Sequence, residues 1–206
     1  EGNRIQMDKQ EAVKYFKKAI EHDSAFAMVE YGMMLLNGEG ITANYEEAAK
    51  YFKKAAELGV PQAMNKYGLL LKDGKGIEMN KSEAIDYFKM AIDKGYNESM
   101  FNYGMMLLEG EGTEMDRTEG ARYIKMAAEN ECTKSMFFYA HLLERGIGVA
   151  VNINEAIKYY QMSYENGVKA AQYCLERLNF SYSFALEKSL LINKLFLDIF
   201  IFYLNN

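Results

Sequence analysis

The sequence predicts an all-α solenoid of about four to five helix-turn-helix repeats. A segment of 14 residues recurs four times at a spacing of 36 without a gap, beginning at Ala27, Ala63, Ser99 and Ser135. A fixed period between 20 and 50 residues is typical of stacked repeats, which bury their apolar faces against their neighbours. Half of the residues are apolar, Trp is absent and Pro occurs once, and this composition suits packed helices joined by glycine turns.

The second helix of each repeat is marked at its start by a capping box. A short polar side chain accepts from the first-turn amides, and a Glu three residues later reaches back. These pairs are Asn44 and Glu47, Asn80 and Glu83, Asp116 and Glu119, and Asn152 and Glu155. Gly59, Gly95 and Gly167 supply left-handed stops at the other end. Glu131 stands at this place in one repeat, so we expect that second helix to end less sharply.

In three of the four copies the first helix carries a glycine in its middle, and Ala140 stands at this position in the fourth. The helix runs from about Ala27 to Leu36 in the first full copy, and Gly32 recurs as Gly68 and Gly104. A glycine inside a helix costs about 1 kcal/mol relative to Ala. Close approach of the paired helix is the simplest reason to retain three of them at one phase.

The repeats occupy residues 1–178, and the chain begins within a repeat. Glu1–Ile5 are in register with Asn37–Ile41, which predicts a turn, a cap at Asp8 and at least one further helix upstream. Residues 179–206 contain no Gly or Met and are rich in apolar residues. They fit a capping helix from about residue 183, a tail anchor, or a segment whose composition reflects AT-rich codons. We favour the cap, because solenoids need a covered end.

The repeated unit resembles the Sel1-like repeat, a relative of the tetratricopeptide repeat. The resemblance rests on the order of its residues: a small residue, Gly, Gly-x-Gly, Asn or Asp, Ala, Tyr, Lys-Ala-Ala and a closing Gly. The resemblance covers residues 1–178. It implies a right-handed α/α superhelix whose first helices line the concave side. It also implies an adaptor or scaffold for protein complexes.

Nothing in the sequence indicates catalysis, a cofactor or a metal. His22 and His141 have no partner cluster, and the Gly-x-Gly segments follow helices and recur, so we interpret them as turns. Cys132 and Cys174 form no disulfide framework or metal motif, which favours a reduced, cytoplasmic setting. The net charge of −5 argues against nucleic acid as a partner. We expect no small-molecule ligand, and no membrane partner unless residues 179–206 are an anchor.

The side of each first helix opposite its core face is the candidate site for a protein or peptide. Placing residues at 100° each gives three columns along the repeats. They are Glu30, Lys66, Asn102 and Phe138; Met33, Leu69, Met105 and His141; and Asn37, Asp73, Glu109 and Arg145. Met adapts to irregular partners, so an apolar row flanked by polar residues suits a bound segment. The alternative is that these side chains pack between repeats.

A further column on the second helices is formed by Lys17, Lys53, Lys89 and Lys125. It fits a solvated face near helix C-termini better than a surface that binds an acidic partner or a membrane. We therefore interpret the chain as a non-catalytic adaptor that binds a protein segment on its concave face. Two alternatives stay open. The repeats regulate or target a catalytic domain upstream, such as a kinase, or they form a rigid part of a larger assembly.

Overall fold

The computed structural model describes residues 2–178, and this part of the chain consists of helices joined by short turns. The helices are α1 (Gly2–Ile20), α2 (Ala25–Asn37), α3 (Tyr45–Glu57), α4 (Pro61–Asp73), α5 (Lys81–Asp93), α6 (Asn97–Glu109), α7 (Arg117–Glu129), α8 (Thr133–Arg145) and α9 (Ile153–Glu165). A further helix covers residues 169–178. The predicted all-α solenoid is confirmed.

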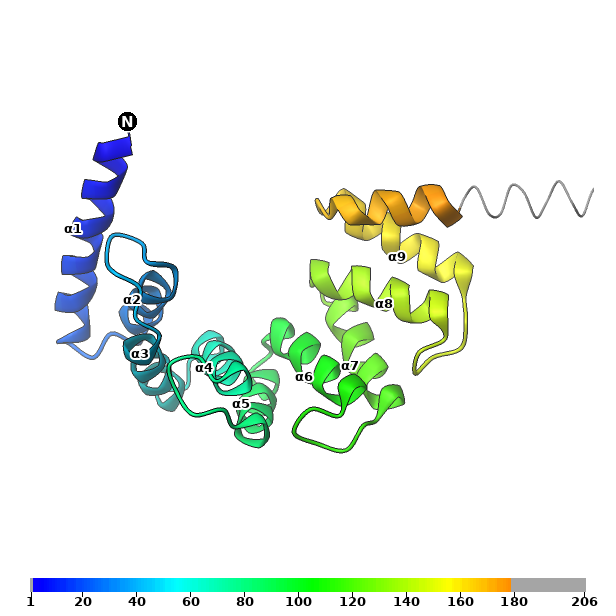
Figure 1. Ribbon diagram of the computed structural model, residues 1–206, viewed down its shortest axis with the longest axis horizontal. Coiled ribbons are helices and arrows are strands. Elements are labelled where there is room, and N and C mark those ends of the chain that lie inside the picture. The colour runs from blue at the N-terminus through cyan, green and yellow to red at the C-terminus, as the bar shows by residue number, and fades with distance from the viewer. Residues whose placement is uncertain (1, 179–206) are drawn as a thin grey trace, which may run out of the picture.

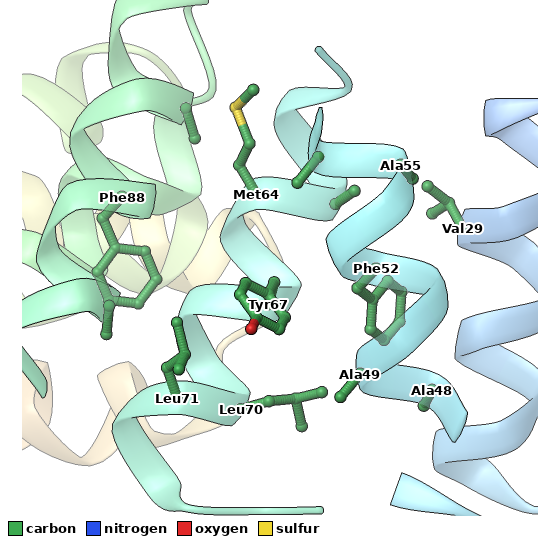
Figure 2. Close-up of a cluster of buried hydrophobic side chains, with 14 of the residues drawn as sticks. Val29, Ala48, Ala49, Phe52, Ala55, Met64, Tyr67, Leu70, Leu71 and Phe88 are labelled. Atoms are coloured by element: carbon green, nitrogen blue, oxygen red, sulfur yellow. The ribbon is translucent and has the colours of Figure 1, made fainter. Parts of the chain in front are cut away.

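Successive helices pack against one another, so the solenoid follows the order of the chain. The stack bends into an arc, and α2, α4 and α6 lie toward its inner side (Figure 1). The core runs along the stack, because each second helix is buried between two first helices. Figure 2 shows Phe52 of α3 between the helices that carry Val29 and Tyr67. All three residues are buried.

The predicted caps begin the second helices. The backbone N–H of Glu47 donates to the side chain of Asn44 at 3.0 Å, and the same bond recurs from Glu83, Glu119 and Glu155 at 2.9–3.1 Å. Pro61 is the first residue of α4, where its missing N–H costs no helix bond.

The glycine inside α2, α4 and α6 leaves room for an aromatic or branched side chain of the following second helix. A Cβ on Gly32 would lie 2.9 Å from the ring of Phe52, and a Cβ on Gly68 would lie 2.8 Å from the ring of Phe88. At Gly104 a Cβ would lie 2.8 Å from both Ile124 and the carbonyl oxygen of Gly120. The predicted close approach of the paired helices is therefore confirmed.

The second glycine of each Gly-x-Gly turn joins consecutive repeats. Gly40 lies against the backbone of Lys9, and the same contact recurs between Gly76 and Tyr45, Gly112 and Lys81, and Gly148 and Arg117. In the last three pairs the partner is the first residue of a second helix in the preceding repeat. A side chain on these glycines would meet backbone atoms, so the turn sets how closely the repeats stack.

Two sequence predictions are wrong. Residues 2–5 belong to α1, which continues through Asp8 to Ile20, so neither a turn nor a helix start is found there. The other error concerns α7, which was expected to end less sharply. It is 13 residues long, the same length as α3. Glu131 adopts the left-handed conformation itself, with φ of 62°, and so ends the repeat as the glycines do. The suggested cap or anchor at 179–206 lies outside the described residues.

Candidate protein-binding surface

The three predicted columns lie on α2, α4, α6 and α8, and none of their members is fully buried. The columns that begin with Glu30 and Met33 are half-buried in every repeat. The column that begins with Asn37 is exposed in every repeat. The accessibility of each column thus repeats with the 36-residue period.

The apolar members of the middle column, Met33, Leu69 and Met105, are here called the inner row. Met33 and Leu69 pack against the core of the first repeats, and Met105 packs against the core of the later ones. Part of each side chain therefore contributes to packing between repeats, as the alternative interpretation expected. The remaining surface leaves three flexible apolar side chains open at equal steps of one repeat.

A buried polar cluster lies beneath Asn102. The side chain amide of Asn102 donates to Oδ1 of Asn65 at 2.7 Å, and the Ser99 hydroxyl donates to the same oxygen at 2.9 Å. Asn65 is fully buried, and its Nδ2 has no hydrogen-bond partner in the structure. Sequence reasoning missed Asn65, although the apolar Val29, Phe101 and Phe137 at the same repeat position mark it as an exception.

Three of the predicted residues, Phe138, His141 and Arg145, line one cavity of about 500 Å³. It lies where α8 meets residues 169–178. The other lining residues were not predicted as part of the site, and they are Phe137, Glu144, Tyr173, Cys174 and Arg177. The sequence signal was the change in the fourth repeat from Leu or Met to His in one column, and from Asn, Asp or Glu to Arg in another.

Glu144 is the acidic member of this cavity, and its charge is compensated. Arg177 donates to it at 2.6 Å, and the hydroxyl of Tyr160 donates to its other oxygen at 3.0 Å. Burial alone would raise the pKa of Glu144, but the two hydrogen bonds outweigh it and lower the pKa below its usual value. Burial also lowers the pKa of His141, and the neighbouring Arg145 lowers it further.

Two of the four residues of the lysine column contact aromatic rings. Lys17 lies over the ring of Tyr31 at 5.4 Å, and Lys89 lies over the ring of Tyr103 at 5.2 Å. Each of these two contacts joins a second helix to the first helix of the next repeat, which gives both lysines a structural role.

Within residues 2–178, no group of three His, Cys, Asp or Glu side chains is placed to hold a metal ion. Both cysteines are free. No described helix combines the length and the apolar character that crossing a membrane requires.

The stacked helix pairs and the open row along them define an α/α repeat protein of the kind that presents surfaces for protein contacts. The chain belongs to the Sel1 repeat family, whose model matches residues 2–24, 25–60, 61–96, 97–132 and 133–168. Sel1 repeat proteins generally bind other proteins, and their solenoid is typically a non-catalytic interaction scaffold. A search of curated proteins finds no match.

Solved structures of this family share the architecture. A Sel1 repeat protein from Oxalobacter formigenes is 29% identical with a TM-score of 0.77, over 81% of this chain and 66% of that one. The antigen c5321 of uropathogenic Escherichia coli is 25% identical with a TM-score of 0.72, over 81% of this chain and 36% of that one. The chain thus spans less than two thirds of either length. The Helicobacter pylori cysteine rich protein B is 21% identical with a TM-score of 0.52, over 64% of this chain and 94% of that one. At this identity the match supports the fold alone.

Proposed function

We propose that this chain is an adaptor that binds a segment of a partner protein along the inner row. The observation that carries the proposal is the equal placement of Met33, Leu69 and Met105 on successive first helices, each half-buried and none closed off. An extended or helical segment that follows the arc would meet one apolar anchor per repeat.

The polar columns on either side supply register. Glu30, Lys66 and Asn102 flank the row on one side, while Asn37, Asp73 and Glu109 flank it on the other. Charged groups at the rim of an interface contribute to orientation and specificity more than to affinity. The row therefore supplies the apolar contact area, and the flanking columns select the partner.

A quantitative pull-down tests the proposal. The parent chain is compared with a triple variant carrying Met33→Glu, Leu69→Glu and Met105→Glu. A matched control carries Met79→Glu, Met90→Glu and Met115→Glu, three apolar residues that are 60%, 45% and 57% exposed away from the row. Both variants gain the same charge. Circular dichroism confirms that both remain helical.

We expect the control to retain the partner and the inner-row variant to lose it. Charge placed in a desolvated interface is costly, because the buried carboxylate has no counterion. If the two variants retain the partner equally, the inner row is packing surface alone and the proposal fails.

A further inference from the structure

The cavity at the end of the described solenoid combines fixed aromatic walls with a cation. Phe138 packs edge-on against Phe101 at 5.0 Å, and Phe137 packs edge-on against Tyr160 at 5.6 Å. These neighbours hold the two rings in place before anything binds. Tyr173, which is 69% exposed, forms a more accessible part of the lining. A preorganised apolar wall loses little side-chain freedom on binding.

Among the charged groups of the cavity, the guanidinium of Arg145 is available to bind a ligand. Glu144 is already paired with Arg177 at 2.6 Å. Arg145 is exposed, and it makes no ion pair or hydrogen bond with any other residue of the described part of the chain. Its guanidinium therefore adds an uncompensated positive charge to the cavity of a protein whose net charge is −5. A planar guanidinium suits a carboxylate, which it can bind through two parallel hydrogen bonds.

We propose that this cavity binds an aromatic or aliphatic residue next to a carboxylate in a protein partner. The apolar group lies against Phe137, Phe138 and Tyr173, and the carboxylate pairs with Arg145. The proposal rests on the proposed function, because the cavity lies on the same face as the predicted columns and contains their last members. It extends the proposed function by specifying one end of the bound segment: there the partner has an acidic group beside an apolar side chain.

The residues beyond 178 are the competing occupant. They follow directly from the helix that lines the cavity, and they contain aromatic residues, Glu187 and Asp198. Charge complementarity alone would admit either this segment or a partner, so the test includes both.

A fragment titration of the full chain, followed by NMR, tests the proposal. The probe is 3-phenylpropionate, and its uncharged isostere 3-phenylpropionamide is the matched ligand control. We expect saturable shifts of the His141 and Tyr173 side-chain resonances with the carboxylate. A charged hydrogen bond contributes enough that the amide should bind roughly tenfold or more weakly. Arg145→Gln should reduce binding of the carboxylate to the level of the amide.

Lys158→Gln is the control variant, since Lys158 is an exposed cation of α9 outside the cavity. It should leave the affinity for the carboxylate unchanged. Equal binding of acid and amide, or no saturable shift at all, would overturn the proposal. Binding that develops only after Glu187→Gln and Asp198→Asn would show that the chain's own C-terminal segment occupies the cavity, which overturns it too.

The outcome is separable from that of the proposed function. The inner-row variant retains every residue of the cavity, so it should bind 3-phenylpropionate as the parent does. If the probe binds while the pull-down shows no dependence on the inner row, the proposed function fails and the cavity chemistry stands. If the probe fails while the inner-row variant loses its partner, the reverse holds.

Discussion

Gly112, in the turn after α6, lies directly against Lys81, the first residue of α5 in the preceding repeat. A Cβ on Gly112 would lie 2.6 Å from Cβ of Lys81 and 2.8 Å from its carbonyl carbon. The Lys81 ammonium in turn pairs with Glu111, the middle residue of the Gly-x-Gly turn, at 2.7 Å. One backbone contact and one ion pair thus join two repeats at the same point.

Gly112→Ala should destabilise the solenoid by about 2–5 kcal/mol. The positive φ of 72° costs a side chain about 1–2 kcal/mol, and the clash with the Lys81 backbone adds about 1–3 kcal/mol. Gly95→Ala is the matched control, because Gly95 also has positive φ but nothing lies within 4 Å of its Cβ position. Urea unfolding followed by circular dichroism measures both. Equal losses would show that stacking does not depend on this contact.

Gly68→Ala should destabilise the fold even though Ala favours the helix by about 1 kcal/mol. The new methyl would lie 2.8 Å from the ring of Phe88, which is fully buried. Overpacking costs about 1–3 kcal/mol, so after the helix gain we expect a net loss of up to about 2 kcal/mol. Phe88→Leu should cost less in the Gly68→Ala background than in the parent, and a double-mutant cycle measures the difference. Additive losses would contradict direct contact as the cause.

The buried cluster around Asn65 should contribute little net stability. Ser99→Ala alone should cost about 1 kcal/mol, since it removes a buried hydrogen bond. Asn65→Val combined with Ser99→Ala removes the unpaired Nδ2 and both hydrogen bonds of Asn65, including the one from the half-buried Asn102. Val already stands at this repeat position as Val29. We expect the double variant to match the parent in urea unfolding. A double variant more than about 1 kcal/mol less stable would mean that the cluster is a net source of stability.

The ion pair of Glu144 with Arg177 should make stability depend on acid pH. The folded-state pKa of Glu144 lies below its unfolded value of about 4.3, so the pair stabilises the protein above that pH. This contribution is lost as the pH falls through the lowered pKa. The difference in unfolding free energy between the parent and Glu144→Gln should be constant from about pH 7 to 8 and shrink below about pH 4.

Glu165→Gln provides the reference for this titration, because Glu165 is exposed and outside the ion pairs of the described residues. Its stability curve should run parallel to that of the parent. If Glu144→Gln also ran parallel, Glu144 would not be held as an ion by Arg177 and Tyr160.

The architecture could be predicted from the sequence because it depends on contacts that recur. Asn44 caps a helix through a bond to a residue three positions away, and Gly32 faces Phe52 within one repeat. Each such relationship is local and is repeated every 36 residues. Gly112 was predicted only as a turn residue, since its contact with Lys81 spans two repeats and becomes visible only when they are stacked.

The errors and omissions fall where the period breaks. Glu131 replaces a glycine and still adopts positive φ, and the backbone N–H groups of Glu131 and Cys132 bond to carbonyl groups of α7. Residue preference alone does not predict this conformation. Asp8 has the spacing of a cap, yet the residues before it continue the helix. The sequence did not predict the cavity because two of its lining residues, Tyr173 and Arg177, belong to residues 169–178. The repeat pattern does not specify how this last helix packs against α8.

Site-specific photo-cross-linking tests the central claim most directly. A photoreactive phenylalanine analogue replaces Leu69 or Met105 in the inner row, or Met79 or Met115 at exposed positions away from it. Mass spectrometry then maps which positions become joined to a captured partner. Binding along the inner row predicts cross-links from positions 69 and 105 to one continuous partner segment, and none from 79 and 115. Cross-links from 79 and 115 alone would place the partner on another face and contradict the account.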